Sequence, residues 1–444
     1  MPVVPRVLVP GVLFLLSGCT NQAPPVATIQ TDGPAVLVAT IEATCDRCAW
    51  DVEGREAVMF RVLLDGRYSS HLPLMRTGRA DYGVLVGSVD AGTHTVALEM
   101  DPASSARGLR APDSATARVV SLQVTVAADP AYAAFAHAPF IYERANASGR
   151  FTDVPVFMWF EQAENPSHAE SREYRYSVVF TNEDGGTPAD RLMATWGRTT
   201  DIENLYNVVL DEQGNVTADE IQGPDHEILR FDGKREARHP LLWVSTDNNM
   251  VLGHGTTSIR YAPAPVRFPL KDQSREAVMD ANPWLYTLAS QELRREGKIV
   301  VDDTPGKSTI PDPRRFVIIE ACGELRDAAL SFSINVDGLW IGSDRGMGYV
   351  IARDGCFRAA IPAPRAIEAR DIIGLRAHAH YRQTKEPQPK PAGPVRLTRV
   401  SKLFMLGSDY QPIASFFFWT GSIELEPGGP PVELPYKFVA PAGD

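Results

Sequence analysis

Hydrophobic and polar residues alternate in short runs along most of the chain, which is the pattern of half-buried β-strands. The first such region has turn-forming Gly, Asp and Pro residues between five runs: AVLVATIE, AVMFRVLL, YGVLVGSV, THTVALEM and ARVVSLQVTV. Short strands at this spacing predict a small sandwich of immunoglobulin or fibronectin type over residues 35–128.

The alternation continues through residues 129–270, where the candidate strands are PVFMWFE, EYRYSVVFT, NLYNVVLD, HEILRF and LLWVS. One short helix fits 188–196, with Thr187 as its cap, Pro188 at its first position and Gly197 after its end. We expect a β-rich middle domain with polar loops.

Residues 271–300 have a helical period instead. Asn282 and Pro283 predict a helix start and Gly297 an end, with apolar residues largely on one face. We expect this insert to pack across the junction of two β domains.

Residues 301–444 return to β, with seven candidate strands: RFVIIEA, ALSFSIN, LWIGSD, GYVIAR, IIGLRAHAHYR, RLTRVSKLFML and ASFFFWTGSIEL. They predict a C-terminal β-sandwich or jelly roll. The 444 residues exceed what one hydrophobic core usually organises. The predicted class is mainly β, a multi-domain β-sandwich or jelly-roll architecture with a short helical insert.

The N-terminus has the order of an export signal: Arg6, an apolar run over 7–16, and then small residues before Cys19. The run is shorter than the roughly 20 residues of a membrane-spanning helix. Leu16-Ser17-Gly18-Cys19 resembles the lipobox of bacterial lipoproteins. The resemblance implies a signal peptide over 1–18 and lipidation of Cys19. The polar, proline-containing residues that follow have no period, so we expect a tether over 19–34.

Acyl chains on Cys19 would make the membrane a partner of this protein. In lipoproteins generally, Thr rather than Asp after the cysteine suggests transfer to the outer membrane, and Thr20 holds that position. We expect a protein of the bacterial cell envelope. The net charge of −11 argues against nucleic acid as a partner.

Four further cysteines remain, and an exported location favours disulfides between neighbours in sequence. We expect Cys45 to pair with Cys48 and Cys322 with Cys356. For the Cys-x-x-Cys at 45–48, a redox-active pair or half of a zinc site stays open.

Three polar loops of the middle domain offer the most unusual chemistry: 182–187, 198–203 and 246–249. A single sheet could present all three at one end, so we expect them to converge. As catalytic acids and bases we select Glu183, Asp184, Asp201 and Glu203, because paired carboxylates can cleave a glycosidic bond. The candidate ligand-binding residues are Asn182, Arg198, Asp247, Asn248, Trp159 and Trp196.

Calcium is a candidate cofactor at Asp184, Asp201 and Asp247, since Ca²⁺ prefers oxygen ligands. Each loop taken alone also fits ordinary turn chemistry. Neither His-Glu-x-x-His nor Gly-x-Ser-x-Gly occurs, which removes the commonest zinc-peptidase and α/β-hydrolase interpretations.

Three short segments are similar to vacuolar-protein-sorting-like secreted domains of unsettled function: HAPFIYER, DHEILRFDG and HPLLWVSTDNN. The chain departs from that pattern at Pro224-Asp225-His226, where Trp-Glu-His would stand. This resemblance bears on the fold of the middle domain and implies no mechanism.

Extracytoplasmic binding of a glycan or another polar surface ligand is the leading expectation for function. The alternatives are a hydrolase of envelope or environmental polysaccharide and a structural envelope protein. Two carboxylates across an open cleft would favour the hydrolase, and an aromatic shelf would favour binding.

Overall fold

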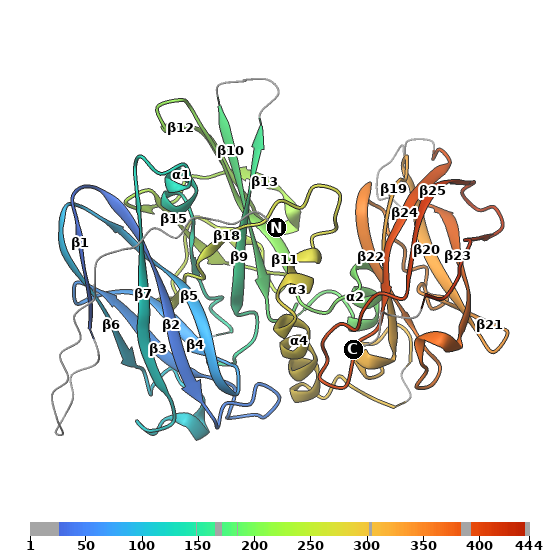
Figure 1. Ribbon diagram of the computed structural model, residues 1–444, viewed down its shortest axis with the longest axis horizontal. Helices are drawn as coiled ribbons and strands as arrows, with labels where there is room; N and C mark the ends of the chain where they lie inside the picture. Colours follow the sequence, from blue (N-terminus) through green and yellow to red (C-terminus); the bar gives the residue numbers. More distant parts are fainter. Residues whose placement is uncertain are drawn as a thin grey trace.

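The computed structural model describes residues 26–147, 149–164, 171–183, 185–301, 304–382 and 392–439. It confirms the mainly β class, with 47% of residues in strands and 11% in helices. The predicted signal peptide, Cys19 and Asp184 lie outside the described residues. Figure 1 shows β sheets on both sides of a central pair of helices, α3 (Ala277–Ala281) and α4 (Trp284–Arg295).

The N-terminal sandwich consists of two facing sheets. The three-stranded sheet has the order β5 (Gly78–Val89), β2 (Ala35–Cys45) and β7 (Thr116–Val126). The nine-stranded sheet has the order β1 (Ala27–Thr31), β6 (Gly92–Met100), β3 (Val58–Leu64), β4 (Arg67–Leu74), β17 (Arg260–Tyr261), β8 (Phe140–Tyr142), β15 (His239–Val244) and β14 (Arg235–Glu236), with β16 (Val251–Leu252) on β15. Alternate side chains such as Ile41, Val62 and Leu98 fill the core between them.

The nine-stranded sheet crosses the predicted domain boundary at residue 128. Strand β4 pairs in parallel with β17 through His71 and Tyr261, and the sheet then continues through strands from the middle region. A further bridge joins Val84 to Pro263. The middle region therefore extends a sheet that the N-terminal strands begin.

A six-stranded sheet forms the rest of the middle region. Its order is β13 (Ile228–Arg230), β12 (Val216–Gln222), β11 (Ile202–Leu210), β10 (Arg172–Phe180), β9 (Pro155–Glu164) and β18 (Pro265–Arg267). Tyr174, Tyr176 and Tyr206 are fully buried in its core. The antiparallel pairing of β10 with β11 brings the loop after β10 next to the segment before β11.

The C-terminal region is a sandwich of two four-stranded sheets, and Figure 1 shows it on the far side of α4. One sheet has the order β22 (Gly355–Pro362), β19 (Phe316–Glu324), β24 (Val395–Phe404) and β25 (Phe417–Leu425). The other has the order β21 (Leu339–Gly342), β20 (Ala328–Val336), β23 (Ile372–Tyr381) and β26 (Val432–Glu433).

Helix α2 (Ala189–Trp196) occupies the predicted helical segment, and Gly197 ends it in the left-handed conformation at φ 68°. Pro188 holds the cap position, so Thr187 is not the cap residue. The other short elements are α1 (Tyr132–Ala136) and the 3₁₀ turns η1 (Arg107–Leu109), η2 (Pro224–His226), η3 (Pro313–Arg315) and η4 (Ala369–Asp371). No helix among the described residues is long and apolar enough to cross a membrane.

Both predicted disulfides are present, Cys45–Cys48 and Cys322–Cys356. Cys45 and Cys48 are 1% and 0% exposed, so this Cys-x-x-Cys lies inside the N-terminal core. The second disulfide joins β19 to β22.

Candidate functional site

The three polar loops meet beside the end of β10 and the start of β11. The Asn249 side chain joins them, because its Nδ2 donates to Asp201 Oδ2 at 2.9 Å and to the carbonyl of Asn182 at 3.2 Å. Gly185 lies so close to Asp247 that a Cβ on the glycine would come within 2.8 Å of the Asp247 Cβ. A residue from each loop thus contacts another loop.

A cluster of acidic side chains forms where the loops meet. Asp201 and Glu203 are 2% and 8% exposed, and their carboxyl groups hydrogen-bond to each other. Burial raises the pKa of both, and the charge of Asp201 raises that of Glu203 further. Two carboxyls this close cannot both ionise easily, so the pair gives up its last proton at a higher pH than an isolated carboxyl would.

Glu183 belongs to the same cluster. Burial, followed by the charge of Asp201, raises its pKa from 4.5 to about 7. A hydrogen bond from Thr187 and the charges of nearby arginines act in the opposite direction. The cluster therefore contains three carboxyl groups whose pKa values are raised by shared burial.

A chain of hydrogen bonds leads from this cluster to the surface. The Gln222 amide hydrogen-bonds to Glu203 and to His226. Its nitrogen donates to Glu203 Oε2 at 3.2 Å, and its oxygen accepts from His226 Nδ1 at 2.8 Å. His226 is exposed, and its Nε2 lies 3.3 Å from Asn248 Nδ2. Sequence analysis selected Asn248 but gave no signal for Gln222.

The predicted ligand-binding polar residues mostly hold the loops together. Asn182 Oδ1 accepts from the Asp153 backbone N–H at 2.9 Å, and the side chain is buried. The Arg198 guanidinium is buried against Glu276, with Nε 3.0 Å from Oε1. Asp247 is the exposed member, and it forms an ion pair with Arg144.

One of the two predicted aromatic platforms is not available for stacking on a ligand. Trp159, on β9, is fully buried in a hydrophobic core, so the prediction for it was wrong. Trp196, at the end of α2, is only partly exposed, and the Arg353 guanidinium lies 5.8 Å from its ring. A central strand of the sheet buries both of its faces, which the sequence of β9 alone did not reveal.

The cavity that reaches Glu183 measures only 10 Å³, which is about the space that one water molecule needs. Within the described ranges, no group of three His, Cys, Asp or Glu side chains could hold a metal ion. Asp201 faces Asn249 and Glu203 while Asp247 faces Arg144, and Asp184 lies outside the description. The calcium expectation gains no support from these residues.

A larger cavity, of 210 Å³, lies between the N-terminal sandwich, the segment that starts β9, and the beginning of α4. Arg76, which follows β4, lies near two rings in its wall, with its guanidinium carbon 4.7 Å from the centre of the Tyr82 ring and 5.1 Å from that of the Trp284 ring. Asp81 and Asn282 also line the cavity, together with apolar side chains. We call this space the interface pocket.

Sequence analysis missed the interface pocket entirely, because its residues follow no motif and come from distant segments. No protein-family model, curated protein or solved structure matches this chain. The geometry of the described residues is therefore the basis for a proposal of function.

Proposed function

We propose that this protein is a lipid-anchored extracytoplasmic binding protein, and that it holds a glycan or another polar ligand in the interface pocket. The observation that supports this most directly is the contact of the Arg76 guanidinium with the rings of both Tyr82 and Trp284. The lipid anchor rests on the sequence at Leu16–Cys19 alone.

The two rings fix the guanidinium in one orientation through cation–π contacts. Its Nε is buried without a partner among the described residues, while its Nη2 donates to the carbonyl of Asp81. The N–H groups of this guanidinium that are neither buried nor bonded can donate to carboxylate oxygens or sugar hydroxyls. Apolar neighbours such as Val156 and Pro263 would contact the less polar face of a sugar ring.

The size of the pocket limits what enters it. At 210 Å³ it is smaller than the roughly 300–1,000 Å³ of sites that enclose a drug-sized ligand. We infer that the pocket takes the terminal unit or a side group of a longer chain, with the rest of that chain outside.

Hydrolysis of a polysaccharide is the second candidate, and the raised pKa of Glu183 favours it because a general acid needs a proton near neutral pH. Burial of Asp201 and Glu203 opposes it, since a catalytic carboxyl must touch the bond that it cleaves. Binding is therefore the better-supported function.

The test is titration of the soluble protein, residues 20–444, with galacturonic acid oligomers and with neutral maltooligosaccharides, following heat of binding and reducing ends. We expect R76Q to weaken binding of the preferred oligomer about tenfold or more, as loss of a hydrogen bond to a charged group does. R79Q is the matched control, because Arg79 lies on β5 outside the pocket and pairs with Glu42. Unchanged affinity in R76Q would contradict the proposal, and new reducing ends would favour the hydrolase.

A further inference from the structure

The two disulfides lie in different surroundings. Cys322 and Cys356 are register partners on β19 and β22, and both line a surface depression of 420 Å³. Cys322 is 7% exposed and Cys356 is half-buried, whereas Cys45 and Cys48 are sealed in a core. A reagent in solution therefore has access to one disulfide and not to the other.

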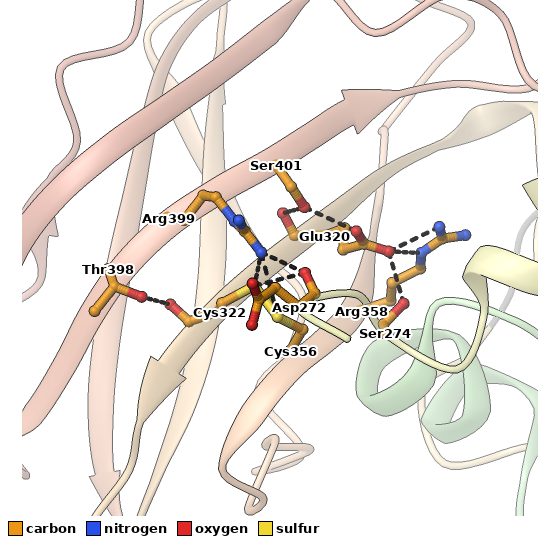
Figure 2. Close-up of a disulfide and its surroundings, with 9 residues drawn as sticks. All are labelled: Asp272, Ser274, Glu320, Cys322, Cys356, Arg358, Thr398, Arg399 and Ser401. Atoms are coloured by element: carbon orange, nitrogen blue, oxygen red, sulfur yellow. Dashed lines mark hydrogen bonds and ion pairs between the residues drawn. A yellow bond between two sulfur atoms is a disulfide. The ribbon is translucent and has the colours of Figure 1, made fainter. Parts of the chain in front are cut away.

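A positive charge lies beside the accessible disulfide, as Figure 2 shows. Arg399 Nη2 is 3.1 Å from Cys322 Sγ and 3.6 Å from Cys356 Sγ. The other described partner of this guanidinium is the backbone carbonyl of Asp272, not a carboxylate, and its Nε is buried without a described partner. The charge of Arg399 is thus available to a sulfur atom.

A guanidinium beside a cysteine stabilises the thiolate over the thiol. In thiol–disulfide exchange the sulfur with the better-stabilised thiolate leaves more readily. Cys322 Sγ is the nearer of the two to Arg399, and Cys356 is the more exposed. We therefore expect a thiolate to attack Cys356, which is the more exposed, and Cys322 to leave, because Arg399 stabilises its thiolate.

We propose that Cys322–Cys356 is a redox-exchange site for a dithiol reductant. A thiolate of the dithiol attacks Cys356 Sγ, a new sulfur–sulfur bond forms there, and Cys322 Sγ leaves as a thiolate beside Arg399. The second thiol of the reductant loses its proton and attacks the reductant sulfur that is bonded to Cys356 Sγ. This releases Cys356 as a thiolate, which takes up a proton. The reductant is oxidised to a disulfide as two electrons pass to the cysteine pair.

The strands allow this exchange without unfolding. Eight register pairs join β19 to β22, and β19 also pairs with β24 on its other side. The sheet therefore holds the two thiols opposite each other after reduction, ready to be oxidised again. This inference is independent of ligand binding in the interface pocket.

The experiment exposes the folded protein to dithiothreitol over a range of concentrations, traps thiols with iodoacetamide, and maps the labelled cysteines by mass spectrometry. We expect Cys322 and Cys356 to be labelled at concentrations that leave Cys45 and Cys48 unlabelled, with circular dichroism unchanged. R399Q should slow the exchange about threefold or more, because the Cys322 thiolate that leaves no longer has a positive charge beside it. The pKa of the Cys322 thiol, from the pH dependence of labelling in the reduced protein, should rise in R399Q.

R396Q is the matched control, because Arg396 lies on the same strand but pairs with Glu324. It should exchange at the wild-type rate. Labelling of Cys45 and Cys48 at the same or lower reductant concentration would overturn the proposal. A wild-type rate in R399Q, or loss of the fold on reduction, would do so as well.

Discussion

The raised pKa of Glu183 makes the free energy of unfolding depend on pH. Its pKa of about 7 in the folded protein lies above its ordinary value of 4.5, so the folded state binds more protons than the unfolded state between these values. The free energy of unfolding therefore falls as pH rises through this interval. The contribution is fully present below about pH 4.5 and is lost above about pH 7.

We expect E183Q to reduce this loss of stability, because glutamine does not titrate. Urea unfolding at pH 5 and pH 8 measures the difference in free energy for wild type and variant. Asp201 and Glu203 shift in the same direction, so the difference should shrink and not vanish. E227Q, on an exposed position, is the control. An identical pH dependence in E183Q and wild type would show that Glu183 is not responsible.

At the residue scale, the sequence predicted part of the loop cluster. Asp201, Glu203 and Asp247 could be predicted because carboxylates in polar loops are recognisable from the sequence alone. The interface pocket was invisible, because Arg76, Tyr82 and Trp284 meet only after three separate elements have packed. Burial was equally hidden, which is why Trp159 was taken for a surface residue.

Among the elements, α4 connects both sandwiches. On one side Arg294 Nη1 lies 2.9 Å from Asp51 Oδ2, and on the other its Nη2 donates to the Tyr410 hydroxyl at 2.7 Å. Deeper in the contact, Trp50 Nε1 donates to Glu292 Oε2 at 2.9 Å. Burial raises the pKa of Glu292 to about 7, although the charge of Arg295 opposes this.

W50F should destabilise the protein by about 1–3 kcal/mol, because phenylalanine leaves the buried Glu292 carboxyl with one donor fewer. Urea unfolding at pH 7 gives this value. The control is D51N, which weakens a partly exposed ion pair of the same helix and should cost within about 1 kcal/mol. Equal losses of unfolding free energy in W50F and D51N would mean that the buried hydrogen bond does not stabilise the protein more than the exposed ion pair.

The strands that sequence analysis missed have identifiable features. Strand β4 carries Ser69, Ser70 and His71 at buried positions, which hides its alternation. Strand β22 is buried on both faces and contains the fully buried Arg358, so the neighbouring GYVIAR was chosen in its place. Ile351 of that segment forms only an isolated bridge with Leu330. Strand β2 was found because buried and partly buried positions alternate along its second half.

For the whole molecule, the proposed anchoring to a membrane depends on Cys19. The C19S variant should lose incorporation of a clickable fatty acid, because it lacks the thiol that we propose accepts the diacylglyceryl group. In-gel fluorescence of the labelled protein measures this, with C322S as a control that keeps Cys19. Normal labelling of C19S would refute the lipid-anchor prediction.

The pairing of β4 with β17 joins segments that are far apart in the chain. Closing the contact between His71 and Tyr261 carries the entropy of a long loop, so we expect it to form after local hairpins such as β3 with β4. Until then β4 has an open edge whose backbone groups can pair with another chain. We therefore expect the risk of pairing with another chain to last until Tyr261 reaches the β4 edge.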